Sequence, residues 1–71
     1  MTSEQKTCER YEFMCEDGAF NVRAMAVESE NDWERQALLD AASGLDAARA
    51  ALSHAYDVVG ATAKEKRRNG Q

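Results

Sequence analysis

The chain has 71 residues, a formal net charge of −4 and a hydrophobic content of 44%. A chain of this length forms one domain whose own core is marginal, and it is too small to enclose the roomy cleft of most enzymes. Its acidic charge argues against non-specific binding to DNA or to anionic lipid, because both need a positive protein surface.

Two cysteines, Cys8 and Cys15, and one histidine, His54, limit the metal and redox chemistry of the chain. A structural zinc site uses about four Cys or His ligands, so we expect no bound metal. A Cys8–Cys15 disulfide would close a very short loop, and neither a leader nor an apolar run of membrane length points to secretion. We therefore predict reduced thiols and a cytoplasmic location. Oligomerisation is then the remaining route to stability.

A thiol activated by His54 would be the strongest catalytic candidate in this chain. No signature surrounds either cysteine, and a cysteine on an apolar face is more often a small core residue. The sequence also contains no phosphate-binding glycine loop and no metal-ligand spacing. We therefore predict a non-enzymatic protein with no catalytic residue, no metal and no cofactor.

Composition divides the chain into three segments. Residues 1–9 are polar and unpatterned, which predicts disorder, and residues 10–63 are expected to form a single small domain. Residues 1–63 carry five basic and twelve acidic groups, a net charge of −7, whereas residues 64–71 carry +3. This basic end lacks apolar residues, so we expect a solvated, disordered tail.

Within the domain, residues 10–27 show a two-residue alternation that is typical of strands. The apolar positions of this alternation are Tyr11, Phe13, Cys15, Phe20, Val22, Ala24 and Ala26. The sequence Glu16-Asp17-Gly18-Ala19 between them favours a turn, because Asp-Gly supports positive backbone angles. We predict a β-hairpin, and hence an α+β fold in which this hairpin precedes one long helix.

A helical pattern covers residues 30–60. Ser29, Asn31 or Asp32 can cap the first free amides of this helix, and acidic residues favour the positive end of its dipole. Apolar residues then recur every seven positions, as they do where two helices pack along their length. The predicted dimer seam comprises Leu38, Ala41, Gly44, Leu45, Ala48, Ala51, Leu52, Ala55 and Val59.

Gly44 leaves two arrangements open for this segment. It could form the corner of a helical hairpin, or it could be a small residue inside one continuous helix. The seven-residue pattern passes through Gly44 without a slip, which favours the continuous helix. Such a helix would be about 45 Å long, more than one hairpin covers, so we expect a second copy to pack against it in an antiparallel homodimer.

The segment 37–48, Ala-Leu-Leu-Asp-Ala-Ala-Ser-Gly-Leu-Asp-Ala-Ala, resembles the Leu-x-x-Ala-Ser-x-Leu-x-x-Ala helix of small pseudomonad proteins of unknown function. Phe20-Asn21-Val22 matches a Phe-x-Val strand that precedes that helix. By its small size and acidity, the chain is also similar to quorum-sensing antiactivators and to anti-CRISPR proteins. That resemblance implies a bacterial or phage protein that blocks a larger host protein, and it carries no motif residue over.

We therefore expect an inhibitor that occludes a transcription regulator or a nucleic-acid-binding complex with a basic surface. Either apolar or acidic side chains could make the contact, and its salt dependence separates the two modes. The candidate partner-binding residues are Glu12, Met14, Glu16, Asp17, Met25, Glu28, Glu30, Asp32, Trp33, Glu34 and Tyr56. The alternatives are an assembly subunit, an antitoxin, or a DNA-binding repressor of the ribbon–helix–helix type.

Overall fold

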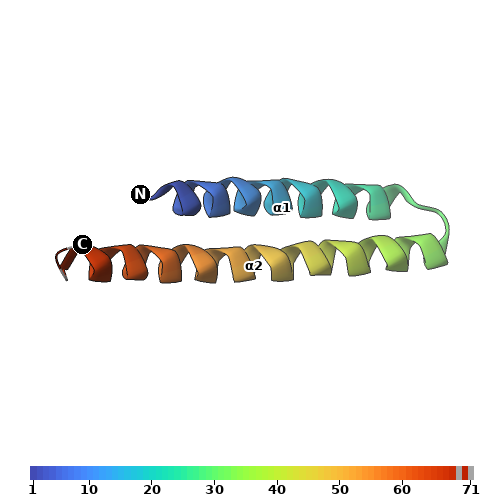
Figure 1. The fold of residues 1–71 in the computed structure, drawn as a ribbon. Helices are drawn as coiled ribbons and strands as arrows, with labels where there is room; N and C mark the ends of the chain where they lie inside the picture. Colours follow the sequence, from blue (N-terminus) through green and yellow to red (C-terminus); the bar gives the residue numbers. More distant parts are fainter. Residues whose placement is uncertain (69, 71) are drawn as a thin grey trace.

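The computed structural model describes residues 1–68 and 70, and over these residues the chain forms a hairpin of two helices. Helix α1 spans Ser3–Glu28 and helix α2 spans Asp32–Arg68. The helices lie antiparallel, joined by residues 29–31, and α2 continues past the start of α1 (Figure 1). The hairpin measures 60 × 14 × 9 Å along its principal axes, so it is a single layer of two helices.

The predicted β-hairpin at residues 10–27, and with it the α+β fold class, is wrong. Those residues lie in α1, and none of the described residues forms a strand. Residues 10–27 fit two patterns at once. Besides the two-residue alternation, they follow a spacing of three and four residues, which brings side chains onto one face of a helix. The α1 positions on the α2 side are Gln5, Cys8, Glu12, Cys15, Ala19, Val22 and Ala26. The exposed aromatic residues of α1 had produced the apparent strand pattern.

Helix α1 begins with a capping box rather than with a disordered segment. The Gln5 backbone N–H donates to Thr2 Oγ1 at 3.0 Å, and the Thr2 N–H donates to Gln5 Oε1 at 2.9 Å. These two bonds satisfy amides that the first helical turn would otherwise leave free. Gln5 also reaches α2, because its Nε2 donates to the Tyr56 carbonyl at 3.3 Å. Residues 3–9, which the sequence predicted to be disordered, are therefore helical and attached to α2.

The turn between the helices is held by Arg35. Its Nε donates to the Ala26 carbonyl at 3.3 Å, a second guanidinium nitrogen donates to the Ser29 carbonyl, and a third pairs with Asp32 at 2.7 Å. The end of α1 thereby gains donors for carbonyls that have no partner within the helix. Asn31 caps α2, since its Oδ1 accepts the Glu34 N–H at 3.0 Å. One of the three predicted capping residues is thus confirmed.

Helix α2 runs through Gly44 without a break, so the prediction of one continuous helix there is confirmed. It continues beyond residue 60 to Arg68, which places residues 64–68 of the predicted basic tail in its last turns. Positions 69 and 71 of that tail lie outside the described residues. The two-helix structure covers part of this long helix with α1 of the same chain. Neither helix combines the length and the apolar character needed to cross a membrane, as far as the described residues go.

The centre of the hairpin is built from small residues. Ala19 and Ala26 of α1 and Ala42 of α2 are buried, and none of the larger side chains among the described residues is fully buried. Leu45 of α2 packs against Gly18, where a β-carbon would stand 3.2 Å from Leu45 Cδ1. Small residues at such positions allow two helices to approach closely. They also bury little apolar area, so the single layer has a thin core.

Candidate protein-binding faces

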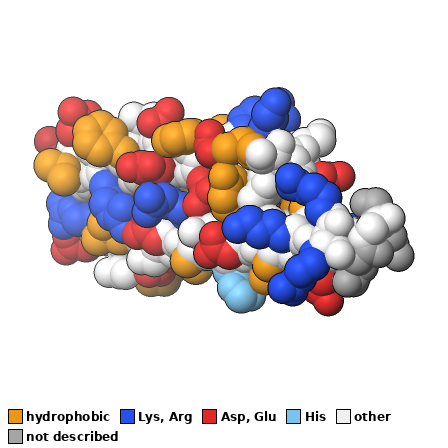
Figure 2. All heavy atoms as spheres, turned by 90° about the vertical axis from the view of Figure 1, so that its left-hand side faces the viewer, with side chains coloured by type: hydrophobic (Ala, Val, Ile, Leu, Met, Phe, Trp, Pro, Cys, Tyr) orange, Lys and Arg blue, Asp and Glu red, His pale blue; other side chains and the backbone are white. Residues whose placement is uncertain are grey.

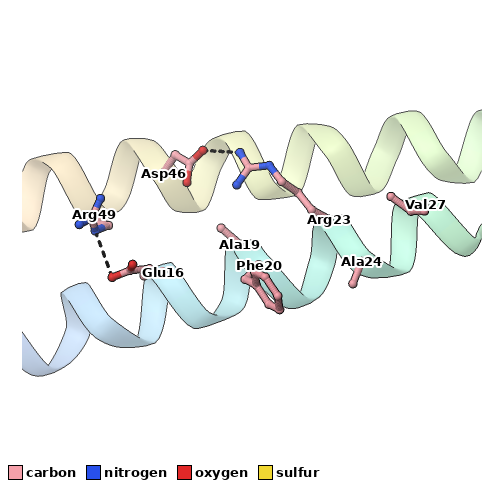
Figure 3. Close-up of a pocket in the computed structure, with 8 residues that line it drawn as sticks. All are labelled: Glu16, Ala19, Phe20, Arg23, Ala24, Val27, Asp46 and Arg49. Carbon is pink, nitrogen blue, oxygen red and sulfur yellow. Dashed lines mark hydrogen bonds and ion pairs between the residues drawn. The ribbon is translucent and has the colours of Figure 1, made fainter.

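An open groove of about 430 Å³ runs along one side of the hairpin (Figure 3). Residues of both helices line it: Glu16, Ala19, Phe20, Arg23, Ala24 and Val27 of α1, and Asp46 and Arg49 of α2. Phe20 does not point into the space between the helices and is 73% exposed. Because the groove is open and lies beside an exposed aromatic ring, it suits the side chains of another protein better than an enclosed small molecule.

Two ion pairs cross between the helices beside this groove. Arg23 pairs with Asp46, and Arg49 Nε lies 3.7 Å from Glu16 Oε2 (Figure 3). The hydrogen bond from Arg23 lowers the pKa of Asp46, although desolvation acts in the opposite direction, and the same contact raises the pKa of Arg23. All four side chains are about half exposed. The pairs therefore add little stability, but they fix which charged groups border the groove.

Three exposed apolar residues, Phe13, Phe20 and Val27, follow one another along this side of α1, and we call them the phenylalanine ridge. They are 61%, 73% and 81% exposed. Residues seven apart lie almost on one line along a helix, about 10 Å from one to the next. The ridge thus offers three apolar contacts over about 21 Å of helix, a pattern suited to packing along another helix.

The opposite side of the hairpin has a different composition. It carries Tyr11, Met14 and Met25 of α1, and Ala37, Ala41, Gly44, Ala48 and Ala51 of α2, all of them exposed. We call this set the alanine face. By helical periodicity, the α1 members lie on the side of Gly18, away from Arg23 and Glu16. No charged residue occupies these columns between Tyr11 and Met25 or between Ala37 and Ala51.

The structure divides the predicted dimer seam between two surfaces. Its larger members belong to the column that faces α1 in the same chain and are half-buried: Leu38, Leu45, Leu52 and Val59. Ala55 is also half-buried. Its remaining members are exposed on the alanine face: Ala41, Gly44, Ala48 and Ala51. The second column against α1 instead contains Ala42, Arg49 and Tyr56, one position after the predicted alanines.

The predicted acidic partner-binding residues do not form one patch. Glu12 is half-buried against α2, Glu16 pairs with Arg49, and Asp32 pairs with Arg35. The other acidic candidates are exposed at two separate places, Asp17 in the middle of α1, and Glu28, Glu30 and Glu34 around the turn. Seen from the end where the chain termini lie, hydrophobic, acidic and basic side chains are interspersed (Figure 2). In that view, no broad area carries one sign of charge.

The predicted apolar partner-binding residues are likewise spread over the hairpin. Met14 and Met25 belong to the alanine face, and Trp33, which is 88% exposed, lies in the first turn of α2. Tyr56 is half-buried near the start of α1, where its carbonyl accepts the Gln5 bond. The sequence prediction missed the exposure of the ridge residues Phe13 and Phe20, which it had placed in a strand. Their seven-residue spacing was the signal that could have revealed the ridge.

The cysteines and the histidine do not assemble a reactive site. Cys8 and Cys15 are free and half-buried on one helix, and seven residues of helix separate them by about 10 Å, beyond disulfide reach. His54 is exposed on α2. Among the residues that the structure describes, no group of three or more His, Cys, Asp or Glu side chains could hold a metal ion.

Comparison with known proteins adds no relative to this picture. No family model matches the chain, and neither a curated protein sequence nor a solved structure matches it.

Proposed function

We propose that this chain is a non-enzymatic protein-binding module, and that its phenylalanine ridge binds a helix of a larger protein and blocks the surface to which that helix contributes. The observation that carries the proposal is the exposure of Phe13, Phe20 and Val27 in one line beside an open groove. Leaving these side chains exposed is unfavourable, because burying one apolar side chain away from water contributes about 1.5–3 kcal/mol of favourable free energy.

The charged residues beside the ridge support an apolar mode of binding with a polar border. Arg23, Asp46, Glu16 and Arg49 already pair with one another across the helices. A partner that packs on Phe20 could keep these pairs at the rim, where water still reaches them, while the aromatic ring enters the desolvated centre. The acidic mode is less well supported, because Glu16 and Asp32 are engaged by arginines of the same chain.

The test compares the capture of proteins from a lysate of the encoding cell by three tagged versions of the chain. The wild type should retain a specific protein that Phe20→Asp loses. Trp33→Asp should retain it, because Trp33 is even more exposed than Phe20 but lies in the first turn of α2, away from the groove. Truncating a central interface aromatic costs about 2 kcal/mol or more, so Phe20→Asp should weaken binding at least about 30-fold.

Salt distinguishes the two binding modes in the same assay. A complex held by the ridge should survive a change from 50 to 500 mM salt, whereas one held by acidic side chains should weaken steeply, because mobile ions screen exposed charges. Capture that is insensitive to Phe20→Asp and collapses in high salt would reject the ridge as the binding site.

A further inference from the structure

We infer that the alanine face is covered by a second copy of this chain, so that two hairpins form a four-helix bundle in which α1 of each copy packs on α2 of its partner. This inference concerns the face opposite the ridge and does not depend on the proposed function. It rests on three observations, namely the excess surface of the single hairpin, the absence of charge on the face, and the size of the side chains on it.

The first observation is the accessible area. A compact monomer of 7.9 kDa exposes about 4,400 Å², whereas this chain exposes 5506 Å². The radius of gyration is 16.9 Å, against about 11 Å for a compact chain of this length. The excess is about 1,100 Å² for each copy and about 2,200 Å² for a pair, which is the size of a permanent homodimer interface.

The second observation is the contrast between the two sides of the hairpin. The groove beside Phe20 is bordered by Arg23, Asp46, Glu16 and Arg49, whose burial would be costly. The columns of the alanine face contain no charged residue from Tyr11 to Met25 of α1 or from Ala37 to Ala51 of α2. Depletion of charge marks the core of a permanent interface, so this face suits a partner that stays bound.

The third observation identifies that partner as another copy. The larger exposed side chains of the face belong to α1, and its small ones belong to α2. Gly18 lies beside Leu45, so the antiparallel hairpin places Met14 near the level of Ala48 and Met25 near that of Ala37. A twofold axis parallel to the helices keeps each residue at its level and sets α1 over the partner's α2. Each methionine then meets an alanine across the interface.

The alternative twofold arrangement fits the side chains less well. It would turn one hairpin end over end, so that α1 packs on α1 and α2 on α2. Bulky residues would then face bulky residues along one pair, and alanines would face alanines along the other. The two helix pairs would need different spacings within one rigid hairpin. The arrangement with α1 on the partner's α2 gives two identical contacts, and it places both turns at the same end of the bundle.

The test measures the mass of the whole chain in solution by sedimentation equilibrium, for wild type, Ala48→Glu and Ala47→Glu. All three should keep the helical circular dichroism of the wild type, because both alanines are exposed in the single hairpin. Wild type and Ala47→Glu should be dimers at tens of micromolar. Ala48→Glu should be a monomer, with its dimer dissociation constant raised at least about 100-fold, because it would bury a charge.

Spin labels test the arrangement of the helices in the same dimer. Cysteine is introduced by Glu30→Cys in a chain carrying Cys8→Ala and Cys15→Ala, after its dimeric mass has been checked. Two turns at the same end should give a label separation well below the roughly 39 Å length of α1. A separation of that length or more would overturn the α1-on-α2 pairing. A wild-type monomer, or a dimer that survives Ala48→Glu but dissociates with Phe20→Asp, would overturn the inference as a whole.

Discussion

Gly18 of α1 lies directly against Leu45 of α2, since a β-carbon on Gly18 would stand 3.2 Å from Leu45 Cδ1. That distance is shorter than an ordinary carbon–carbon contact. A methyl group could be accommodated if the Leu45 side chain moved by a few tenths of an ångström. A β-branched side chain would need a larger displacement of Leu45. The stability of a variant with such a side chain at position 18 therefore reports how tightly α1 and α2 pack.

Gly18→Val should therefore lower the free energy of unfolding by about 1–3 kcal/mol through overpacking. The measurement is urea denaturation followed by circular dichroism. Ala47→Val is the control, because it introduces the same branched residue at an exposed helical position and loses only about 0.6 kcal/mol of helix propensity. Without contact between Gly18 and Leu45, Gly18→Val would instead gain about 0.4 kcal/mol, because valine has a better helix propensity than glycine, and such a gain would contradict the packing.

Gly44 offers the opposite case, because a β-carbon there would meet no atom of the same chain within 4 Å. In the Ala48→Glu background, which should be monomeric, Gly44→Ala should raise the free energy of unfolding by about 1 kcal/mol. The gain has one source, the better helix propensity of alanine inside a continuous helix. Urea denaturation measures it, and a loss of stability in that background would indicate that α2 bends at Gly44.

Gln5 joins the start of α1 to α2, and its removal should loosen that end of the hairpin. Gln5→Ala loses the acceptor for the Thr2 N–H and the donor to the Tyr56 carbonyl, which should reduce stability by about 1 kcal/mol. Amide hydrogen exchange should accelerate over residues 3–9. Gln36→Ala is the matched control, because the Gln36 side chain bonds only to exposed Asp40 on the same helix. Unchanged exchange over 3–9 would contradict the attachment.

Arg35 should be sensitive even to a change that preserves its charge. Lysine cannot reproduce a fork that donates to both Ala26 and Ser29 carbonyls, so Arg35→Lys should cost about 1–2 kcal/mol. Thermal unfolding measures the loss. Arg10→Lys serves as control, because Arg10 lies on the surface near the Tyr11 ring and not at the turn. If both variants had the melting temperature of the wild type, Arg35 would not contribute to holding the turn.

The Arg23–Asp46 pair should contribute a pH-dependent part of stability. Arg23 lowers the pKa of Asp46 in the folded chain, so the folded state favours the ionised carboxylate. The contribution is present in full above about pH 4, the ordinary range of an aspartate, and it is lost as the pH falls through the lower pKa of the folded state. Because both side chains are about half exposed, the effect should be small and should decrease with salt.

Asp46→Asn tests this linkage. The difference in melting temperature between wild type and Asp46→Asn should be largest near neutral pH and should shrink as the pH falls below about 4. Asp17→Asn, an exposed change on the outer side of α1, controls for the general effect of removing one negative charge. A difference that grows on acidification would have the wrong sign for a carboxylate that is stabilised by an arginine.

The second helix was largely predictable because its signals are local. Leu38, Leu45 and Leu52 repeat every seven residues through Gly44, and that pattern correctly indicated an uninterrupted helix with these side chains on one face. Asn31 could be proposed as a cap because capping depends on residues within one turn of the helix start. Periodicity and capping need no knowledge of the rest of the chain.

The first helix could not be read in the same way. In α1, exposed Tyr11, Phe13 and Phe20 gave a strand-like alternation, and Asp17-Gly18 suggested a turn that helical packing against Leu45 overrides. Local patterns in a short amphipathic segment fit both states, and the tertiary contact with α2 decides between them. Local sequence patterns could not predict the two candidate faces either, because the exposure of a residue depends on which side of its helix packs against the other helix.

By itself, the sequence determined that residues beyond Asn31 form a long helix with a repeating apolar column. It did so because backbone propensity and side-chain periodicity act over a few neighbouring residues. The tertiary structure alone decided that α1 is a helix, that Ala42 rather than Ala41 is buried against it, and that the phenylalanine ridge and the alanine face remain open. Those choices depend on where a second helix lies, and residues far apart in the chain fix that position together.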